Sequence, residues 1–153
     1  MTLVRCAMDF PASVKEAERL WYEVHRWPSF IEGFGEIVHV DESWPTQGSG
    51  AVWDSTPAGR GRVSERILEH RPGQGGLSEI SDDRLSGTRQ VTFQELAATA
   101  EDSSAVRVAV ELDYRLTGSR LRALFIDRLF VRRPVLESMQ RELERFGHEL
   151  PLS

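Results

Sequence analysis

The sequence predicts an α+β fold in which a curved antiparallel sheet of six or seven strands wraps around a long C-terminal helix. The order of the segments is the first indication. One strand-like and two short helical segments precede a run of short β-rich segments, and one long amphipathic segment follows them. The second indication is the length of the connections, about two to six residues, which is too short for a parallel crossover. Neighbouring strands are therefore expected to be antiparallel.

The chain is expected to open with a strand and a helix. Residues 2–10 alternate and end at Pro11, as is typical of a strand. Ser13 should cap the helix that begins at residue 14, because Glu16 follows it at the capping-box spacing.

This helix should stop before Trp27-Pro28, since the residue that precedes a proline avoids the helical region. Residues 28–34 can form a second short helix with the proline in its first turn. The β-rich segments that follow are separated by turn-forming stretches. They cover residues 36–44, 50–56, 61–70, 76–83, 89–98 and 105–116.

The last strand and the final helix have the clearest patterns. Residues 105–116 place apolar side chains on one face and largely charged ones on the other, so one side of the sheet should face the core. Residues 119–150 carry an apolar stripe at helical spacing. Pro134 should kink or interrupt this helix, and Gly147 and Pro151 should end it.

Composition limits the classes of function. The 153 residues predict a single domain, residues 1–153, and the net charge of −5 argues against a general nucleic-acid-binding protein. Cys6 is the one cysteine, so the chain cannot form an internal disulfide. Because no segment resembles a signal peptide or a membrane span, we expect a cytoplasmic protein. No metal or cofactor is expected, since the histidines lack ligand-like spacing with other metal-binding residues.

Four segments, taken in their order and spacing, resemble the START-like helix-grip (SRPBCC) superfamily, which includes the birch-pollen allergen. Within it, they are similar to the bacterial polyketide cyclase/dehydrase-like branch. The segments are "FPASVKEAERLWYEVHRWPSFIEGF", "GRVSERILEHRPG", "VRVAVELDYRL" and "RLFVRRPVLESMQRELERF". The resemblance extends from about Leu3 to Glu149. It implies a pocket between the sheet and the final helix that holds an apolar or aromatic ligand.

The resemblance assigns several side chains to this pocket. Trp27, Phe30, Ile31 and Phe34 would line or cover its mouth, although the same side chains could simply fill the end of the barrel as core. Tyr114 would place a phenol in the interior, where it needs a polar partner. The full set of candidate ligand-binding residues is Trp27, Phe30, Ile31, Phe34, His39, Trp53, Tyr114, Phe125, Leu129 and Met139.

Arg66 and His70 are the candidate catalytic residues. They share one face of the strand 61–70, and if that face points inward, Arg66 could stabilise an oxyanion during ring closure or dehydration. If it points outward, both residues belong to a solvated surface. In the aromatase/cyclase branch, the resemblance implies a pocket tyrosine where this chain has Phe34, and a pocket arginine near His70 and Arg71. Phe34 has no hydroxyl to donate, which weakens the case for polyketide cyclisation.

Five arginines crowd the first half of the final helix: Arg120, Arg122, Arg128, Arg132 and Arg133. This arginine patch is either a solvated helix face or a contact surface for an acyl-carrier protein, an anionic membrane or RNA. The sequence does not indicate the oligomeric state.

We therefore expect a module that binds a hydrophobic small molecule, such as a lipid, a quinone or a polyketide-like compound. The first alternative is a cofactor-independent cyclase or dehydrase of the lyase or isomerase type. The second is a regulatory protein that meets a macromolecular partner through the arginine patch.

Overall fold

The computed structural model describes residues 1–152 except 58, 98–102 and 118–130. Seven antiparallel strands form one sheet in the order β1-β7-β6-β5-β4-β3-β2. The strands are β1 (Thr2–Phe10), β2 (Phe34–Val40), β3 (Gly50–Ser55), β4 (Arg62–Arg71), β5 (Gly75–Ser81), β6 (Leu85–Leu96) and β7 (Ala105–Leu116). The helical segments are α1 (Val14–Tyr22), η1 (Val24–Arg26), α2 (Trp27–Phe30), α4 (Arg132–Glu149) and η3 (Leu150–Leu152).

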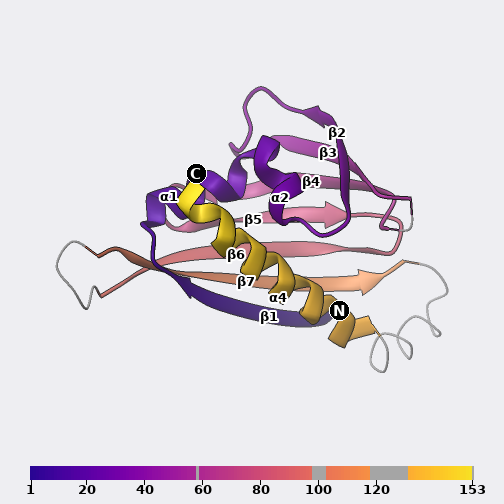
Figure 1. The fold of residues 1–153 in the computed structure, drawn as a ribbon. Helices are drawn as coiled ribbons and strands as arrows, with labels where there is room; N and C mark the ends of the chain where they lie inside the picture. Colours follow the sequence, from indigo (N-terminus) through magenta and orange to yellow (C-terminus); the bar gives the residue numbers. More distant parts are fainter. Residues whose placement is uncertain (58, 98–102, 118–130, 153) are drawn as a thin grey trace.

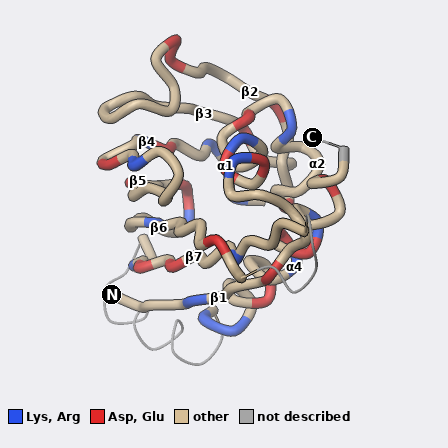
Figure 2. The backbone as a smooth tube through the Cα atoms, turned by 90° about the vertical axis from the view of Figure 1, so that its left-hand side faces the viewer, with Lys and Arg blue, Asp and Glu red and all other residues tan. Residues whose placement is uncertain are grey.

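The helices cover one face of the curved sheet. In Figure 1, α4 crosses that face diagonally, and α1 and α2 lie beside its C-terminal end. Figure 2 shows the same arrangement from the side, with the strands stacked in one layer and α4 in the other. The predicted α+β fold, with two short helices after the first strand, is confirmed.

Strand β7, which lies between β1 and β6, follows the predicted alternation. Its inward side chains are buried, and the residues between them are more exposed. Several inward positions have apolar neighbours on the adjoining strands: Val108 opposes Phe93 of β6, and Leu112 opposes Val4 of β1. The buried set is Val106, Val108, Val110, Leu112 and Tyr114.

The first helix begins where predicted and ends earlier. The Ser13 hydroxyl accepts a hydrogen bond from the Glu16 backbone N–H at 3.1 Å, which confirms the capping interaction. However, α1 ends at Tyr22, and Trp27 adopts helical dihedral angles (φ −55°, ψ −37°) directly before Pro28. The prediction that the residue before Pro28 would leave the helical region is therefore wrong. Burial of Trp27 accounts for this, since its indole N–H donates to the Trp21 carbonyl at 2.9 Å.

The final helix departs from the prediction at Gly147, whereas Pro151 follows the end of α4 as predicted. The predicted kink at Pro134 involves residues 118–130, which the structure does not describe, so it stays a prediction. Pro134 lies in the first turn of α4, where its missing N–H removes no helical hydrogen bond. Gly147 lies inside the helix instead of ending it, because a Cβ at this position would be 2.5 Å from Cε1 of Phe10. Glycine is thus required where α4 packs on β1. Residues 118–130, the first part of the predicted helix, lie outside the described residues.

The buried side chains form two hydrophobic clusters. The larger joins α1, α2 and the C-terminal half of α4 to the sheet, with Trp27, Phe30 and Phe146 among its members. The smaller joins Ile80, Leu85, Leu112 and Tyr114 to the N-terminal half of α4. Met139 packs against both clusters, and the site lies between them.

Candidate functional site

A cavity of about 1010 Å³ separates the sheet from α4. This volume is at the upper end of the range of about 300–1,000 Å³ that is usual for small-molecule sites. Its apolar wall takes side chains from both hydrophobic clusters. These are Trp21, Trp27, Phe30, Ile31, Ile80, Leu85, Val110, Leu112, Val135, Met139 and Leu143.

Two charged side chains from the sheet form an ion pair at the cavity. Nη2 of Arg89 on β6 donates to both carboxylate oxygens of Glu65 on β4, at 2.9 Å for Oε2. The pair reaches diagonally across β5, where Arg89 opposes Ser78 and Glu65 opposes Ile80. Serine is small enough to let the guanidinium pass above it. The Arg89 guanidinium also lies 5.2 Å from the centre of the Trp21 ring, which fixes its orientation.

A second arginine enters from the loop between β3 and β4. Nε of Arg60 donates to Oδ2 of Asp82 at 2.5 Å, and the Asp82 side chain is fully buried. The other Asp82 oxygen accepts the backbone N–H groups of Arg84 and Leu85 at 2.7 and 3.0 Å. Because Asp82 is held by these bonds, it positions the Arg60 guanidinium, which lies 5.7 Å from the centre of the Trp53 ring.

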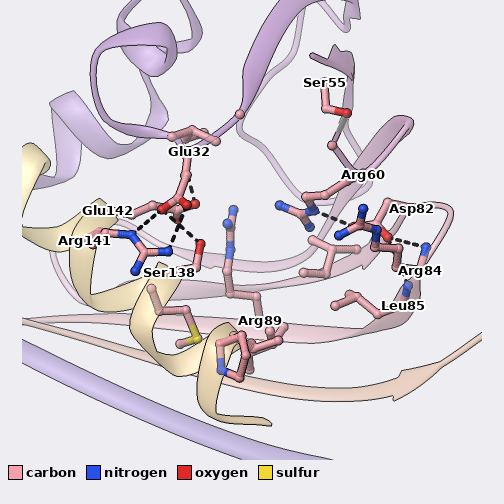
Figure 3. Close-up of a pocket in the computed structure, with 18 of the residues that line it drawn as sticks. Glu32, Ser55, Arg60, Asp82, Arg84, Leu85, Arg89, Ser138, Arg141 and Glu142 are labelled. Carbon is pink, nitrogen blue, oxygen red and sulfur yellow. Dashed lines mark hydrogen bonds and ion pairs between the residues drawn. The ribbon is translucent and has the colours of Figure 1, made fainter. Parts of the chain in front are cut away.

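Glu142 projects from α4 toward these two arginines. Figure 3 shows Arg60 and Arg89 pointing into the space beside it. Its Oε1 accepts the backbone N–H of Glu32 at 3.2 Å. Burial raises the pKa of Glu142, although Arg60 and Arg89 act in the opposite direction. We call Arg60, Glu65, Asp82, Arg89 and Glu142 the inner polar cluster.

Glu32 connects the segment after α2 to α4. Its carboxylate accepts two hydrogen bonds from Arg141, both at 2.9 Å, and a third from the Ser138 hydroxyl at 3.3 Å. The hydrogen bonds from Arg141 hold the pKa of Glu32 below its usual value. These contacts fasten the two segments together at one side of the cavity (Figure 3).

Four of the residues predicted to bind ligand line the cavity: Trp27, Phe30, Ile31 and Met139. Trp27 and Phe30 are also almost fully buried, with 2% and 3% of their surface exposed. Trp27 and Phe30 are therefore part of both the cavity wall and the core, and their contact with a ligand stays a prediction.

The other described candidates lie outside this cavity wall. Phe34 stacks on Trp53 with the ring centres 4.7 Å apart, and both belong to the neighbouring core. Tyr114 is completely buried in the smaller cluster. His39 is exposed on β2, with Nε2 2.9 Å from an Asp41 carboxylate oxygen. Phe125 and Leu129 lie outside the described residues.

The structure places the two candidate catalytic residues away from the cavity wall. On β4, Val63, Glu65 and Ile67 are buried, whereas Arg66 is exposed, so Arg66 lies on the outer face. His70 is half-buried at the far end of the strand, with its ring centre 5.0 Å from that of Tyr22. Its Nδ1 is buried and forms no hydrogen bond with the residues that the structure describes.

The arginine patch is described only in part. Arg132 and Arg133 are exposed at the start of α4, and Arg133 pairs with Glu137 at 3.1 Å. Arg120, Arg122 and Arg128 lie outside the described residues, so a partner surface there stays a prediction.

The sequence analysis did not assign the inner polar cluster to the site, although the sequence carries a signal for three of its members. Arg89 shares strand parity with Val91 and Phe93, and Glu65 stands between Val63 and Ile67. A charge at an inward position of a strand must be paired or face a cavity. Glu142 likewise lies on the apolar stripe of its helix, three residues after Met139. Arg60 and Asp82 stand in or beside loops, where no periodicity marks them.

The described part of the chain was also searched for metal sites and for membrane-spanning helices. There, no group of three or more His, Cys, Asp or Glu side chains is arranged to hold a metal ion. No helix within the same residues is long and apolar enough to cross a membrane.

No family model and no curated protein sequence matches the chain. Solved structures do match it over nearly its whole length. A conserved protein from Geobacillus kaustophilus is 8% identical with a TM-score of 0.74, over 99% of this chain and 97% of that one. Ara h 8.0201 is 13% identical with a TM-score of 0.67, over 99% of both chains. Norcoclaurine synthase from Thalictrum flavum is 10% identical with a TM-score of 0.64, over 99% and 94%. These likenesses confirm the START-like helix-grip fold.

Proposed function

We propose that this helix-grip protein binds a hydrophobic small molecule, of the lipid, quinone or polyketide type, in the cavity between the sheet and α4. The cavity supports the proposal, because protein interiors are normally close-packed and this one has an apolar-walled space between two clusters. The fold is also compatible with such a role. Norcoclaurine synthase, which shares it, has been solved in complex with dopamine and hydroxybenzaldehyde.

The proposal is tested with protein purified from its own host. Native mass spectrometry should detect a bound small molecule, and a panel of lipids, quinones and aromatic polyketides should contain members that bind. Val135→Trp, which adds an indole to the cavity wall on α4, should lower their affinity by about tenfold or more. Leu68→Trp is the matched control, since Leu68 is exposed on β4. If no member of the panel binds the wild-type protein, the proposal is wrong.

An enzyme of the cyclase or dehydrase type is the second candidate. The observation in its favour is Glu142, an acid with a raised pKa that faces the N–H groups of two arginines. Such a set could protonate a leaving hydroxyl while stabilising an enolate oxygen. Glu142→Gln should then lower turnover of a polyketide-type substrate by about a hundredfold, with little loss of binding. Unchanged turnover would exclude Glu142 from any chemical step.

A further inference from the structure

We propose that the ligand is an amphipathic carboxylic acid, whose carboxylate is bound by Arg60, Arg89 and Glu142 while its apolar body fills the cavity. The inference rests on the proposed function and adds the chemistry of the ligand's polar end. The juxtaposition that supports it is visible in Figure 3, where both guanidinium groups point into the space beside Glu142.

The two arginines have more hydrogen-bond donors than their partners use. Arg89 donates to Glu65 through Nη2, and Arg60 donates to Asp82 through Nε. Among the described residues, Nε and Nη1 of Arg89 and both Nη atoms of Arg60 form no hydrogen bond. These groups line the cavity, so a bound molecule would separate them from water. A ligand without acceptors would therefore leave charged donors unpaired, which is costly.

A carboxylate matches these donors better than other polar groups. Its two oxygens offer about four acceptor positions, and a guanidinium can bind them through paired N–H groups. The protonated form of Glu142 would add an O–H donor to the same space. An ammonium group would bring a third cation beside two guanidinium groups. An alcohol or an ester has fewer or weaker acceptors.

The charge of the surroundings requires Glu142 to be protonated when the acid binds. Glu65 and Asp82 already balance Arg89 and Arg60. The other titratable groups near Glu142 are Cys6, Glu32 and Arg141, and the last two balance each other as an ion pair. An ionised Glu142 would therefore repel a second carboxylate. Binding of the acid is expected to take up a proton from solution, and binding of its ester is not.

Two matched probe series test the inference. The first is dodecanoic acid with its methyl ester, dodecanol and dodecylamine, and the second is 2-naphthylacetic acid with its methyl ester and the corresponding alcohol. Affinities are measured by displacement of a fluorescent apolar dye. In at least one series, the acid should bind about tenfold or more tightly than its ester and alcohol, as expected for charge-assisted hydrogen bonds. Calorimetry in two buffers of different ionisation enthalpy should show proton uptake for that acid, and Glu142→Gln should abolish it.

Three variants localise the effect. Arg89→Met and Arg60→Met should each bring the ratio of acid to ester affinity close to one, and Arg89→Lys should reduce it while keeping a charge for Glu65. Arg62→Met is the control, because Arg62 pairs with Asp54 on the exposed face; it should keep the wild-type ratio. If ester, alcohol or amine binds as tightly as the acid in both series, the inference is wrong and the proposed function stands. If no probe binds, this inference falls, and the broader panel decides the proposed function.

Discussion

Arg89 and Glu65 are placed by the sheet where neither can reach bulk water easily. The Glu65 side chain is 6% exposed and that of Arg89 is 20% exposed. Removing one partner of such a pair leaves a buried charge unpaired, at a cost of about 3–5 kcal/mol. We predict that Glu65→Leu lowers the free energy of unfolding by about 3 kcal/mol, measured by urea denaturation. This predicted loss is at the low end of the range because the Arg89 guanidinium, left without its partner, still faces the cavity.

The double variant Glu65→Leu/Arg89→Met separates the ion pair from ordinary packing. It removes both charges and should recover most of the stability that the single variant loses. Arg107→Met serves as the control, since its pair with Asp9 is exposed, and should change stability little. If the loss of unfolding free energy in the double variant equals the sum of the losses in Glu65→Leu and Arg89→Met, the two residues are not coupled.

Glu142 should make the stability of the protein fall as the pH rises. Burial raises its folded-state pKa above the ordinary value of 4.5, so the folded protein holds this proton more tightly than the unfolded chain. The resulting stabilisation is present below about pH 4.5 and is lost as the pH rises through the folded pKa. Glu142→Gln keeps an acceptor for the Glu32 N–H but cannot ionise. We predict that the stability of this variant relative to wild type increases from about pH 4.5 to about pH 8.

The comparison with the variant isolates Glu142 from the other carboxyl groups. Side-chain hydrogen bonds from Arg107, Arg141 and Arg62 lower the pKa values of Asp9, Glu32 and Asp54. Their contribution to stability has the opposite sign and is lost as the pH falls. The wild-type protein and Glu142→Gln share this contribution, so it cancels when the stability of one is subtracted from that of the other. A difference that does not change with pH would show that Glu142 is not desolvated.

At the scale of elements, α4 is held against β1 by a contact that tolerates no side chain on the helix. A Cβ at Gly147 would lie 2.5 Å and 2.8 Å from Cε1 and Cδ1 of Phe10. The Phe10 ring cannot move aside easily, because it is buried and packs edge-on against Phe146 at 5.7 Å.

Gly147→Ala is therefore predicted to destabilise the protein. Helix propensity alone would give a gain of about 1 kcal/mol, whereas overpacking costs about 1–3 kcal/mol. We expect a net loss of about 1 kcal/mol in thermal or urea unfolding. Gln140→Ala, at an exposed position of the same helix, should have almost no effect. A more stable Gly147→Ala would mean that α4 can move away from β1 at no cost.

The elements differ in how well the sequence predicted them. Residues 105–116 were predicted correctly because β7 is paired on both sides, by β1 and β6, and its alternation agrees with its burial. The first helix was predicted to continue to residue 26 but ends at Tyr22, since the turn after Tyr22 depends on the burial of Trp27, a tertiary contact. Gly147 was misassigned for the same reason: its role depends on Phe10, which is remote in the sequence.

At the scale of the whole molecule, the sequence predicted the fold more fully than the site. Short connections and one amphipathic helix leave few ways to bury the apolar faces. Part of the apolar cavity wall was expected from the family resemblance, as Phe30 and Met139 show. The polar part was not expected, because the side chains of Arg89 and Glu65 meet only across an intervening strand. Strand parity marks each of them as unusual, but the distance between them depends on register.

The cavity divides the core of the molecule into two clusters. A substitution that fills the cavity should therefore stabilise the ligand-free protein and weaken ligand binding. Val135 lies on α4 beside the smaller cluster and lines the cavity. Val135→Trp fills part of this space with apolar atoms. We predict that it raises the free energy of unfolding of the ligand-free protein by about 1 kcal/mol, as cavity-filling substitutions commonly do.

The same variant should lose the stabilisation that a ligand gives. A ligand at about a hundred times its Kd stabilises the wild-type protein by about 2.7 kcal/mol, because it binds the folded state alone. In Val135→Trp, the shift in Tm at that ligand concentration should be much smaller, while Leu68→Trp should keep the full shift. A Val135→Trp protein that is less stable than wild type would show that the space beside α4 cannot accept an indole. Loss of the shift in both variants would place the binding site elsewhere.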